Sequence, residues 1–259
     1  MRRILLVLIA MVAVLGVGAA TAAADPPAPP GTPTATSFDG VPSVGPLFSS
    51  STSTPHGCTA SVVASPSRDL IITAAHCLSG TGAGPVFAPG YDNGATPYGV
   101  WTVTAAYVDP AWIASQDPTA DYAILRVAKH GRTAVQDVTG GALVGLAPRK
   151  GQRITDIAYN AGINDQPITC TVPTYRTAGY PAFNCHGYVG GSSGSPWLTT
   201  VPGTRLSVVH GVIGGLHQGG CFEYTSYSSP FDASIYRVLG RATVGATSDV
   251  LPPAGSDGC

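Results

Sequence analysis

The sequence predicts an all-β protein, and three observations on its 259 residues support that prediction. Charged residues make up only 10% of the chain, too few for the charged faces of long solvent-exposed helices. Glycine (33 residues) and proline (23 residues) are abundant, which favours many turns. The apolar segments are short, rich in β-branched residues and bounded by Ser, Pro or Gly clusters, a pattern typical of strands.

The N-terminus has the pattern of an export signal. Two arginines precede the apolar run 4–20, and three alanines at 22–24 supply the small residues that a signal peptidase requires. We expect residues 1–24 to be a signal peptide cleaved before Asp25, which gives a secreted, extracellular protein with no stable membrane association. An uncleaved anchor is the competing interpretation, because the apolar run approaches the length of a membrane span.

The segment after the signal is rich in proline and threonine. Residues 25–40 contain too few apolar side chains to form a packed core. We expect an extended or disordered leader or propeptide here, with ordered structure beginning near Val41.

The six cysteines fit disulfides better than a metal site. Their number is even, and the sequence contains neither a CxxC pair nor an HExxH motif. Six cysteines allow 15 pairings. We expect one bridge across a short loop, one between adjacent strands, and one between the two cysteines that remain. The three expected pairs are Cys58–Cys77, Cys170–Cys185 and Cys221–Cys259.

The charge balance restricts the partners. The formal net charge is −1, and no run of Lys or Arg forms a basic patch for nucleic acid or for a membrane surface. We therefore expect no nucleic-acid partner, and the sequence indicates no metal or cofactor site.

The first half of the chain contains several segments with the pattern of strands, and two of these segments adjoin candidate catalytic residues. The expected strands are 41–48, 58–64, 69–75, 99–108 and 121–127. His76 follows the third strand directly, and a disulfide at Cys77 would hold it rigidly, as a catalytic base requires. Asp121 begins the last strand.

Asp121 is the expected partner of His76. A buried carboxylate that accepts the ring N–H of a histidine selects its tautomer and stabilises the imidazolium. Asp117 is the alternative acid, but it lies in a polar loop and lacks the apolar continuation that follows Asp121.

The segment 190–197 (GGSSGSPW) crowds three hydroxyls among three glycines. Glycines at that density let the backbone turn sharply and direct its N–H groups at a ligand. A serine hydroxyl is a poor nucleophile at neutral pH, so this loop indicates chemistry only together with a base and an orienting acid. Taken alone, it is more typical of a surface turn than of a catalytic loop.

Together, TAAHC, then DYAIL 45 residues after the histidine, then GGSSGSP resemble the chymotrypsin-like (trypsin-fold) serine proteases over residues 41–245. The SGSP sequence is similar to the bacterial secreted branch that includes glutamyl endopeptidases, where animal enzymes have SGGP. The resemblance implies a serine endopeptidase that acts on protein or peptide substrates. It makes His76 the general base, Asp121 its orienting acid and Ser193 the nucleophile, with an oxyanion hole formed by the N–H groups of Gly191 and Ser193.

The fold implied by this resemblance is two six-stranded antiparallel β-barrels with the catalytic residues between them. The N-terminal barrel would comprise residues 41–135 and the C-terminal barrel residues 136–259. A short helix near Ile235, Val238 and Leu239 would dock on the second barrel.

The sequence departs from the animal enzymes in two places. Ser192 stands where those enzymes have an aspartate, and no Ile-Val-Gly-Gly segment is present. Activation by insertion of a new N-terminus against that aspartate is therefore not expected.

Two other functions are consistent with parts of the sequence. GGSSG also matches the GxSxG elbow of α/β-hydrolases, which would make Ser192 the nucleophile of an esterase, but that fold needs a helix directly after the serine. The other is a chymotrypsin-like module that binds peptides or surfaces without cleaving them. A binding module has no need of His76 and Asp121.

Substrate preference is expected to depend on Tyr188, His217 and Gly219. The resemblance places 215–220 (GLHQGG) beside the primary specificity pocket, and no acidic residue lies in 183–191 to select Lys or Arg. His217 and the Tyr188 hydroxyl would donate hydrogen bonds to a glutamate side chain. Alternatively, Tyr188 fills part of the pocket, which then prefers small or apolar side chains.

Overall fold

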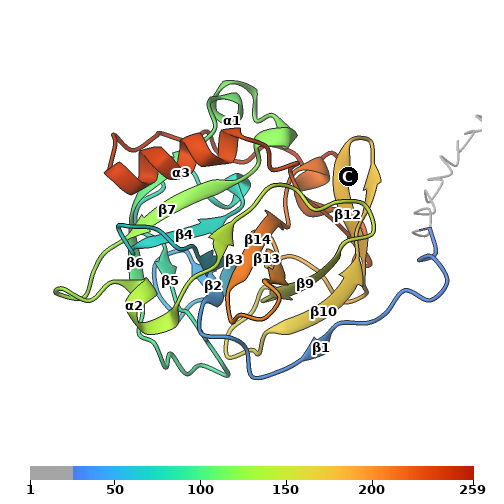
Figure 1. Cartoon of the computed structure of the whole chain (residues 1–259), viewed down its shortest axis with the longest axis horizontal. Helices are drawn as coiled ribbons and strands as arrows, with labels where there is room; N and C mark the ends of the chain where they lie inside the picture. Colours follow the sequence, from blue (N-terminus) through green and yellow to red (C-terminus); the bar gives the residue numbers. More distant parts are fainter. Residues whose placement is uncertain (1–25) are drawn as a thin grey trace, which may run out of the picture.

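The structure is a computed structural model that describes residues 26–259. The expected signal peptide and the cleavage before Asp25 lie outside the described residues. Two β-rich halves lie side by side, with the first on the left and the second on the right of Figure 1. Strands predominate, so the all-β prediction is confirmed. Within the described part of the chain, no helix has the length and apolar character needed to cross a membrane.

The first half is a closed barrel of antiparallel strands in the order β2-β3-β4-β7-β6-β5. Its strands are β2 (Val44–Phe48), β3 (His56–Val62), β4 (Leu70–Thr73), β5 (Val86–Phe87), β6 (Trp101–Val108) and β7 (Ala123–Val127). Successive side chains on a strand point to opposite faces. On β4, Ile71 therefore lies in the barrel core, while Leu70 and Ile72 lie in a second core outside it.

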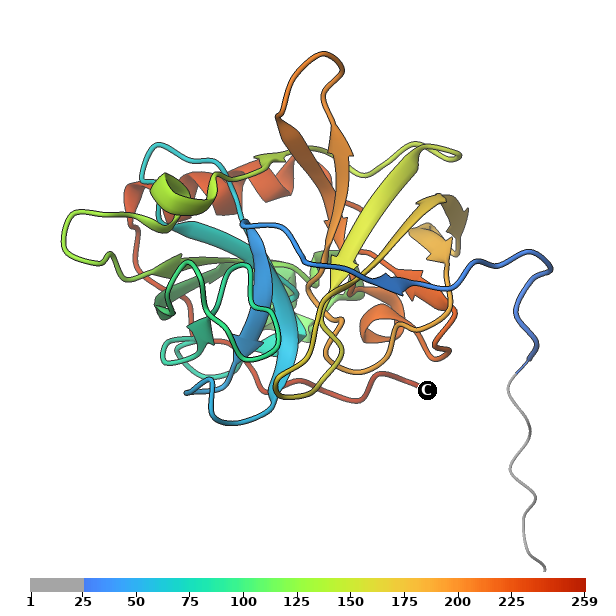
Figure 2. The same ribbon diagram turned by 90° about the horizontal axis from the view of Figure 1, so that it is seen from below.

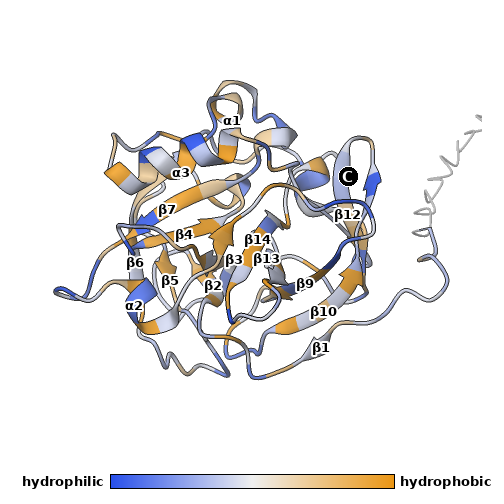
Figure 3. Cartoon of the chain, viewed as in Figure 1, coloured by the Kyte–Doolittle hydropathy of each residue, from blue (hydrophilic) through white to orange (hydrophobic). Residues whose placement is uncertain are grey.

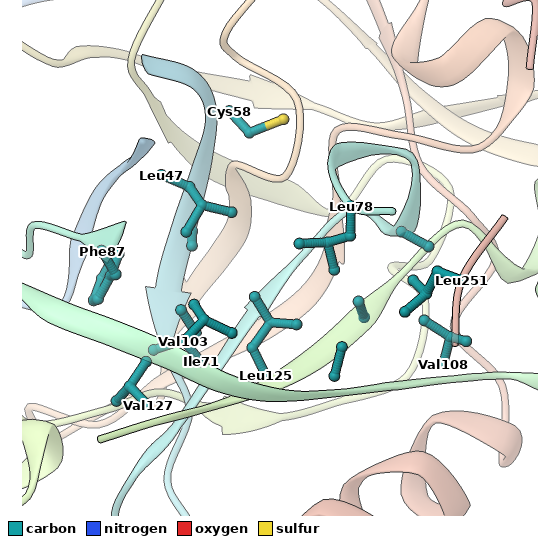
Figure 4. Packing of buried hydrophobic residues seen from close by; sticks show 14 of the residues in the cluster. Leu47, Cys58, Ile71, Leu78, Phe87, Val103, Val108, Leu125, Val127 and Leu251 are labelled. Atoms are coloured by element: carbon teal, nitrogen blue, oxygen red, sulfur yellow. The ribbon is translucent and has the colours of Figure 1, made fainter. Parts of the chain in front are cut away.

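Both faces of these central strands are covered, which explains their nearly continuous apolar sequence. Figure 3 shows hydrophobic residues concentrated on β3, β4 and β7. In the barrel interior, Leu47, Ile71, Val103 and Leu125 converge (Figure 4).

The second half contains two sheets around its own core. A six-stranded sheet has the order β1-β10-β9-β13-β14-β8, and a three-stranded sheet has the order β11-β12-β15. The bounds are β1 (Thr36–Ser37), β8 (Leu143–Val144), β9 (Arg153–Ala158), β10 (Ile168–Pro173), β11 (Tyr175–Thr177), β12 (Tyr180–Asn184), β13 (Pro196–Thr200), β14 (Ser207–Val212) and β15 (Thr225–Tyr227). The first half is therefore a closed six-stranded barrel, as expected. The strands of the second half are divided between two sheets.

Short helices connect the strands. They are α1 (Pro110–Ser115), α2 (Val135–Thr139), and the 3₁₀ turns η1 (Ala75–Cys77), η2 (Pro118–Ala120) and η3 (Leu216–Gly219). The expected C-terminal helix is α3 (Ser234–Val244), which continues through Gly240 and ends at Gly245 in a left-handed conformation.

The docking side predicted for α3 is wrong. The helix packs against β6 and β7 of the first barrel (Figure 1). Its apolar stripe shares a core with Tyr107 and Ile124, which point outward from those strands. The Arg126 guanidinium on β7 donates to the carbonyl of Ala242 at 2.7 Å, and a cation is favourable at the end of a helix where carbonyls lack partners.

The segment before Val41 is extended, which is one of the two expected alternatives, but ordered structure begins earlier than the expected start near Val41. β1 pairs with β10, and the N–H of Ala35 donates to the carbonyl of His186 at 2.9 Å. Figures 1 and 2 show this extended segment running along the second half. The reason is that the edge of β10 offers unpaired backbone groups, which an extended chain satisfies without needing a core of its own.

Three disulfides join the cysteines in the pairs expected from the sequence. They are Cys58–Cys77, Cys170–Cys185 and Cys221–Cys259, and residues 26–259 contain no free cysteine. The first holds β3 to the turn that carries His76.

Candidate active site

His76 and Asp121 form a close pair at the edge of the first barrel. Nδ1 of His76 lies 2.7 Å from Oδ2 of Asp121. The Asp121 side chain is fully buried and that of His76 is 8% exposed. A carboxylate oxygen can only accept, so Nδ1 carries the proton and Nε2 is left with a free lone pair.

Two backbone donors fix the orientation of the Asp121 carboxylate. The His76 N–H donates to Oδ1 at 2.9 Å, and the Gly215 N–H from the second half donates to Oδ2 at 2.8 Å. Hydrogen bonds to a charged group are stronger than neutral ones. Asp117, the alternative acid, instead caps η2 by accepting from the N–H of Thr119 at 2.8 Å.

The nucleophile loop, residues 190–195, is held between the two halves. The Ser193 carbonyl accepts from the N–H of Thr59 at 2.7 Å, and the Gly194 N–H donates to the Ile213 carbonyl at 2.7 Å. Gly194 has φ +83°, and a Cβ at this position would collide with the backbone of Thr59. Glycine is therefore required where the loop crosses β3.

The three hydroxyls of the nucleophile loop are not equivalent. Ser192 is 5% exposed, and its hydroxyl donates to the Val189 carbonyl at 2.8 Å. Ser195 is fully buried, and its hydroxyl donates to Asp156 at 2.9 Å. The Ser193 hydroxyl makes no hydrogen bond within residues 26–259, and Ser193 lines the same cleft as His76.

The backbone beside Ser193 presents two free donors. The N–H groups of Gly191 and Ser193 make no hydrogen bond to any described residue. Gly191 has φ +97° and packs so closely on Ala161 that a Cβ would overlap its backbone nitrogen. Two unpaired N–H groups next to a hydroxyl form an arrangement suited to stabilising an oxyanion.

A Ser192 nucleophile does not fit this geometry. The GxSxG elbow requires a helix immediately after the serine. Here strand β13 (Pro196–Thr200) follows the loop, and the Ser192 hydroxyl already has a partner.

Comparison with known proteins gives the family. Residues 58–204 match the model of the trypsin-like peptidase domain. The chain belongs to the trypsin-like peptidase family. It is a serine endopeptidase with the chymotrypsin-like fold, and the corresponding predictions are confirmed. No curated protein matches the sequence.

Solved structures of other proteases have the same fold. The protease Anisep from Arthrobacter nicotinovorans is 23% identical with a TM-score of 0.68, covering 82% of this chain and all of that one. The thermostable serine protease AL20 from an extremophilic microorganism is 26% identical with a TM-score of 0.66, covering 78% and 97%. A Glu endopeptidase, solved in complex with MPD, is 17% identical with a TM-score of 0.60, covering 83% and 98%.

The cleft of this serine endopeptidase has a volume of about 760 Å³ and contains the three residues expected to select the substrate, Tyr188, His217 and Gly219. The Tyr188 hydroxyl does not point into it. Tyr188 is 4% exposed, its ring packs edge-on against Phe183, and its hydroxyl lies 3.5 Å from the carbonyl oxygen of Asp156. The expected donation from Tyr188 to a substrate glutamate is therefore wrong, because that hydroxyl lies in the core.

His217 is also committed to a protein partner. Its Nδ1 lies 3.0 Å from the carbonyl oxygen of Asp257, so Nδ1 is the donor in that hydrogen bond. In the neutral ring Nε2 is then an acceptor and cannot donate to a carboxylate.

Two acidic residues not expected at the site from the sequence, Glu223 and Asp257, line the cleft. Although partial burial opposes it, hydrogen bonds from His186 and from the Gly187 N–H hold the Glu223 pKa below its usual value. Both residues are far in sequence from 183–191, the segment that contains no acidic residue. The expected Cys221–Cys259 disulfide was the sequence signal that could have placed Asp257 at the cleft, because Asp257 lies two residues before Cys259.

Asp156 is a fully buried carboxyl beneath the nucleophile loop. Burial raises its pKa well above the ordinary value, although hydrogen bonds from Ser195 and Tyr188 oppose the rise. No charged side chain contributes to the shift. The Asp156 residue therefore keeps its proton to higher pH than an ordinary aspartate, and it joins the nucleophile loop to the segment that contains Tyr188.

Two groups of histidine and cysteine have their ligand-type atoms close together. They are Cys58, His76 and Cys77, and His217, Cys221 and Cys259. In both groups the sulfurs are joined in disulfides and cannot act as thiolate ligands. Their geometry fits disulfide bridges beside the cleft rather than metal sites.

Proposed function

We propose that the protein is a secreted serine endopeptidase that hydrolyses peptide bonds with Ser193 as nucleophile, His76 as general base and Asp121 as the orienting acid. The observation that carries the proposal is the 2.7 Å pair of His76 and Asp121 in the cleft that also holds the unpaired Ser193 hydroxyl. The division of roles follows the chemistry of a Ser-His-Asp triad.

In the first step the Ser193 oxygen forms a bond to the substrate carbonyl carbon, and its proton passes to Nε2 of His76. The carbonyl oxygen becomes negative and is stabilised by the N–H groups of Gly191 and Ser193. Asp121 stabilises the imidazolium without taking its proton.

The intermediate then collapses to an acyl-enzyme. The carbon–nitrogen bond breaks, and the departing amine takes the proton from Nε2 of His76. Water then repeats the sequence as nucleophile, giving its proton to the same nitrogen, and the proton returns to the Ser193 oxygen when the acid product leaves.

The side chain before the cleaved bond is proposed to be small or apolar. A preference for glutamate needs donors in the cleft, but the Tyr188 hydroxyl is buried and His217 donates to Asp257. The carboxylate of Glu223 in the same cleft would repel a substrate carboxylate. The similarity to a Glu endopeptidase, at 17% identity, establishes the fold alone.

A peptide library varied at the residue before the cleaved bond tests this preference. We expect cleavage mainly after Ala, Val, Leu or Phe. Predominant cleavage after Glu would show that His217 donates a hydrogen bond to the substrate carboxylate. Predominant cleavage after Lys or Arg would show that Glu223 or Asp257 pairs with the substrate cation.

Secretion is proposed from the N-terminal pattern and from the three disulfides, which are stable in an oxidising compartment. The pairing of β1 with β10 favours a mature chain that retains residues 33–37. N-terminal sequencing of protein from the culture medium is expected to give a start near Asp25. A start at Val41 would contradict that pairing.

The assignment of the nucleophile is tested by two neighbouring substitutions. Ser193→Ala is expected to lower kcat by a factor on the order of 10⁶, because the triad acts as a unit. Ser192→Ala is the matched control: it removes a neighbouring hydroxyl that already bonds Val189 and should leave most of the activity. Equal inactivation of both folded variants would show that the nucleophile is assigned wrongly.

A further inference from the structure

The last residues of the chain cross from the first half to the second beside the cleft. Leu251 is buried in the core of the first barrel (Figure 4), and its N–H donates to the Gly80 carbonyl at 2.7 Å. From there the chain runs along the lower side of the molecule in Figure 2. At its other end, Cys259 is bonded to Cys221 in the second half. We call residues 253–259 the C-terminal strap.

Gly255 is the point at which the strap is tied to both halves. Its N–H donates at 2.7 Å to Oε1 of Gln116, which follows α1 in the first half. Its carbonyl accepts at 2.8 Å from Nε2 of Gln218 in η3 of the second half. Nε2 of Gln116 also donates to the Pro253 carbonyl at 2.8 Å, so one glutamine amide holds two strap residues.

The strap lies where the two halves approach each other. The turns η2 and η3, one from each half, are in contact beside it. Next along the strap, the Asp257 carbonyl accepts from His217, and Asp257 lines the cleft that contains His76 and Ser193. The strap thus forms a wall of the cleft. The Gln116 and Gln218 amides, the His217 ring and one disulfide hold it in place.

We propose that the C-terminal strap closes the His217 end of the cleft and limits how many substrate residues bind on the acyl side of the cleaved bond. This inference rests on the proposed role of Ser193. His217, Gly219 and Asp257 line the same cleft. With His217 and Gly219 at the pocket for the side chain before the cleaved bond, as the family resemblance implies, the preceding substrate residues are expected to run toward the strap. The substrates best suited to such a cleft have few ordered residues before that bond, and longer extensions gain no contact.

Two variants open the strap in different ways. Cys221→Ser with Cys259→Ser removes the covalent tie. Gln116→Asn keeps the disulfide and shortens the amide that holds Gly255 and Pro253; asparagine also tolerates the left-handed backbone of Gln116, φ +52°. Gln152→Asn is the matched control, because the Gln152 amide accepts a backbone N–H from Arg149 and does not line the cleft.

The experiment measures kcat/KM for fluorogenic peptides with one to seven residues before the cleaved bond, and for a second series extended only after it. For the wild type and Gln152→Asn, we expect kcat/KM to stop rising beyond three or four residues. For the opened variants, it should continue to rise, by about fivefold for each added backbone hydrogen bond. The shortest substrate and the second series should be unaffected.

The proposal would be overturned if kcat/KM depended on peptide length in the same way in all four proteins. It would also be overturned if the opened variants lost kcat/KM only for long substrates, because the strap would then be a binding contact and not a barrier. Absence of hydrolysis of the shortest substrate by the wild type would instead count against the proposed function. Binding of the same peptides is also measured in a Ser193→Ala background, where no hydrolysis takes place. The dependence of Kd on peptide length then tests the strap separately from the proposed function of Ser193.

Discussion

At the scale of single residues, the site depends on the hydrogen bonds that stabilise the negative charge of one buried carboxylate, that of Asp121. Asp121 has no exposed surface, and leaving a charge there without partners would be costly. Its oxygens accept from the His76 ring, the His76 N–H and the Gly215 N–H. Donors from both halves of the molecule thus hold one carboxylate in the orientation that selects the Nδ1–H tautomer of His76.

Replacement of this carboxylate by an amide should separate structure from catalysis. Asp121→Asn is expected to fold but to lose turnover by a factor on the order of 10⁴, because an amide N–H facing Nδ1 favours the wrong tautomer. Asp117→Asn is the control, since that side chain only caps η2. Peptide hydrolysis measured for both variants decides: a near-normal rate for Asp121→Asn would show that another acid orients His76.

At the scale of elements, the nucleophile loop is supported from below by β9. The Ser195 hydroxyl donates to the Asp156 carboxyl on that strand, and the Tyr188 hydroxyl lies beside the same residue. Because the folded pKa of Asp156 lies well above its ordinary value of 3.8, the folded protein retains a proton that the unfolded chain releases. Its contribution to the free energy of unfolding is full below about pH 3.8 and is lost as pH rises through the folded pKa.

Asp156→Asn should remove this dependence, because an amide does not titrate. Relative to the parent, the variant is expected to become more stable as pH increases from about 4 up to the folded pKa of Asp156, by up to about 1.36 kcal/mol per pH unit. Denaturant unfolding at pH 4, 6 and 8, in a Ser193→Ala background that prevents self-digestion, measures the difference. A difference that is constant with pH would contradict a raised pKa of Asp156 in the folded protein.

At the scale of the whole molecule, the sequence predicts what depends on local pattern and fails where distant segments meet. The all-β class, the helix at Ile235 and Val238 and the three disulfides follow from composition, periodicity and spacing. The pairing of His76 with Asp121 was expected because a family motif carries long-range information in a short segment.

Other features depend on tertiary packing that no single segment specifies. Tyr188 directs its hydroxyl into the core because its ring fills space beside Phe183. The helix α3 selects the first barrel because β6 and β7 carry apolar residues on their outer face. Glu223 and Asp257 reach the cleft from segments outside 183–191, and the expected Cys221–Cys259 bond was the sequence signal that connected Asp257 to it.

The central claim is that Ser193, activated by His76 and Asp121, is the nucleophile. Treatment of the purified protein with a fluorophosphonate, followed by location of the adduct by mass spectrometry, tests this assignment. We expect one adduct per molecule, on Ser193, and its loss in His76→Ala. An adduct on Ser192, or no adduct on the folded protein, would contradict it.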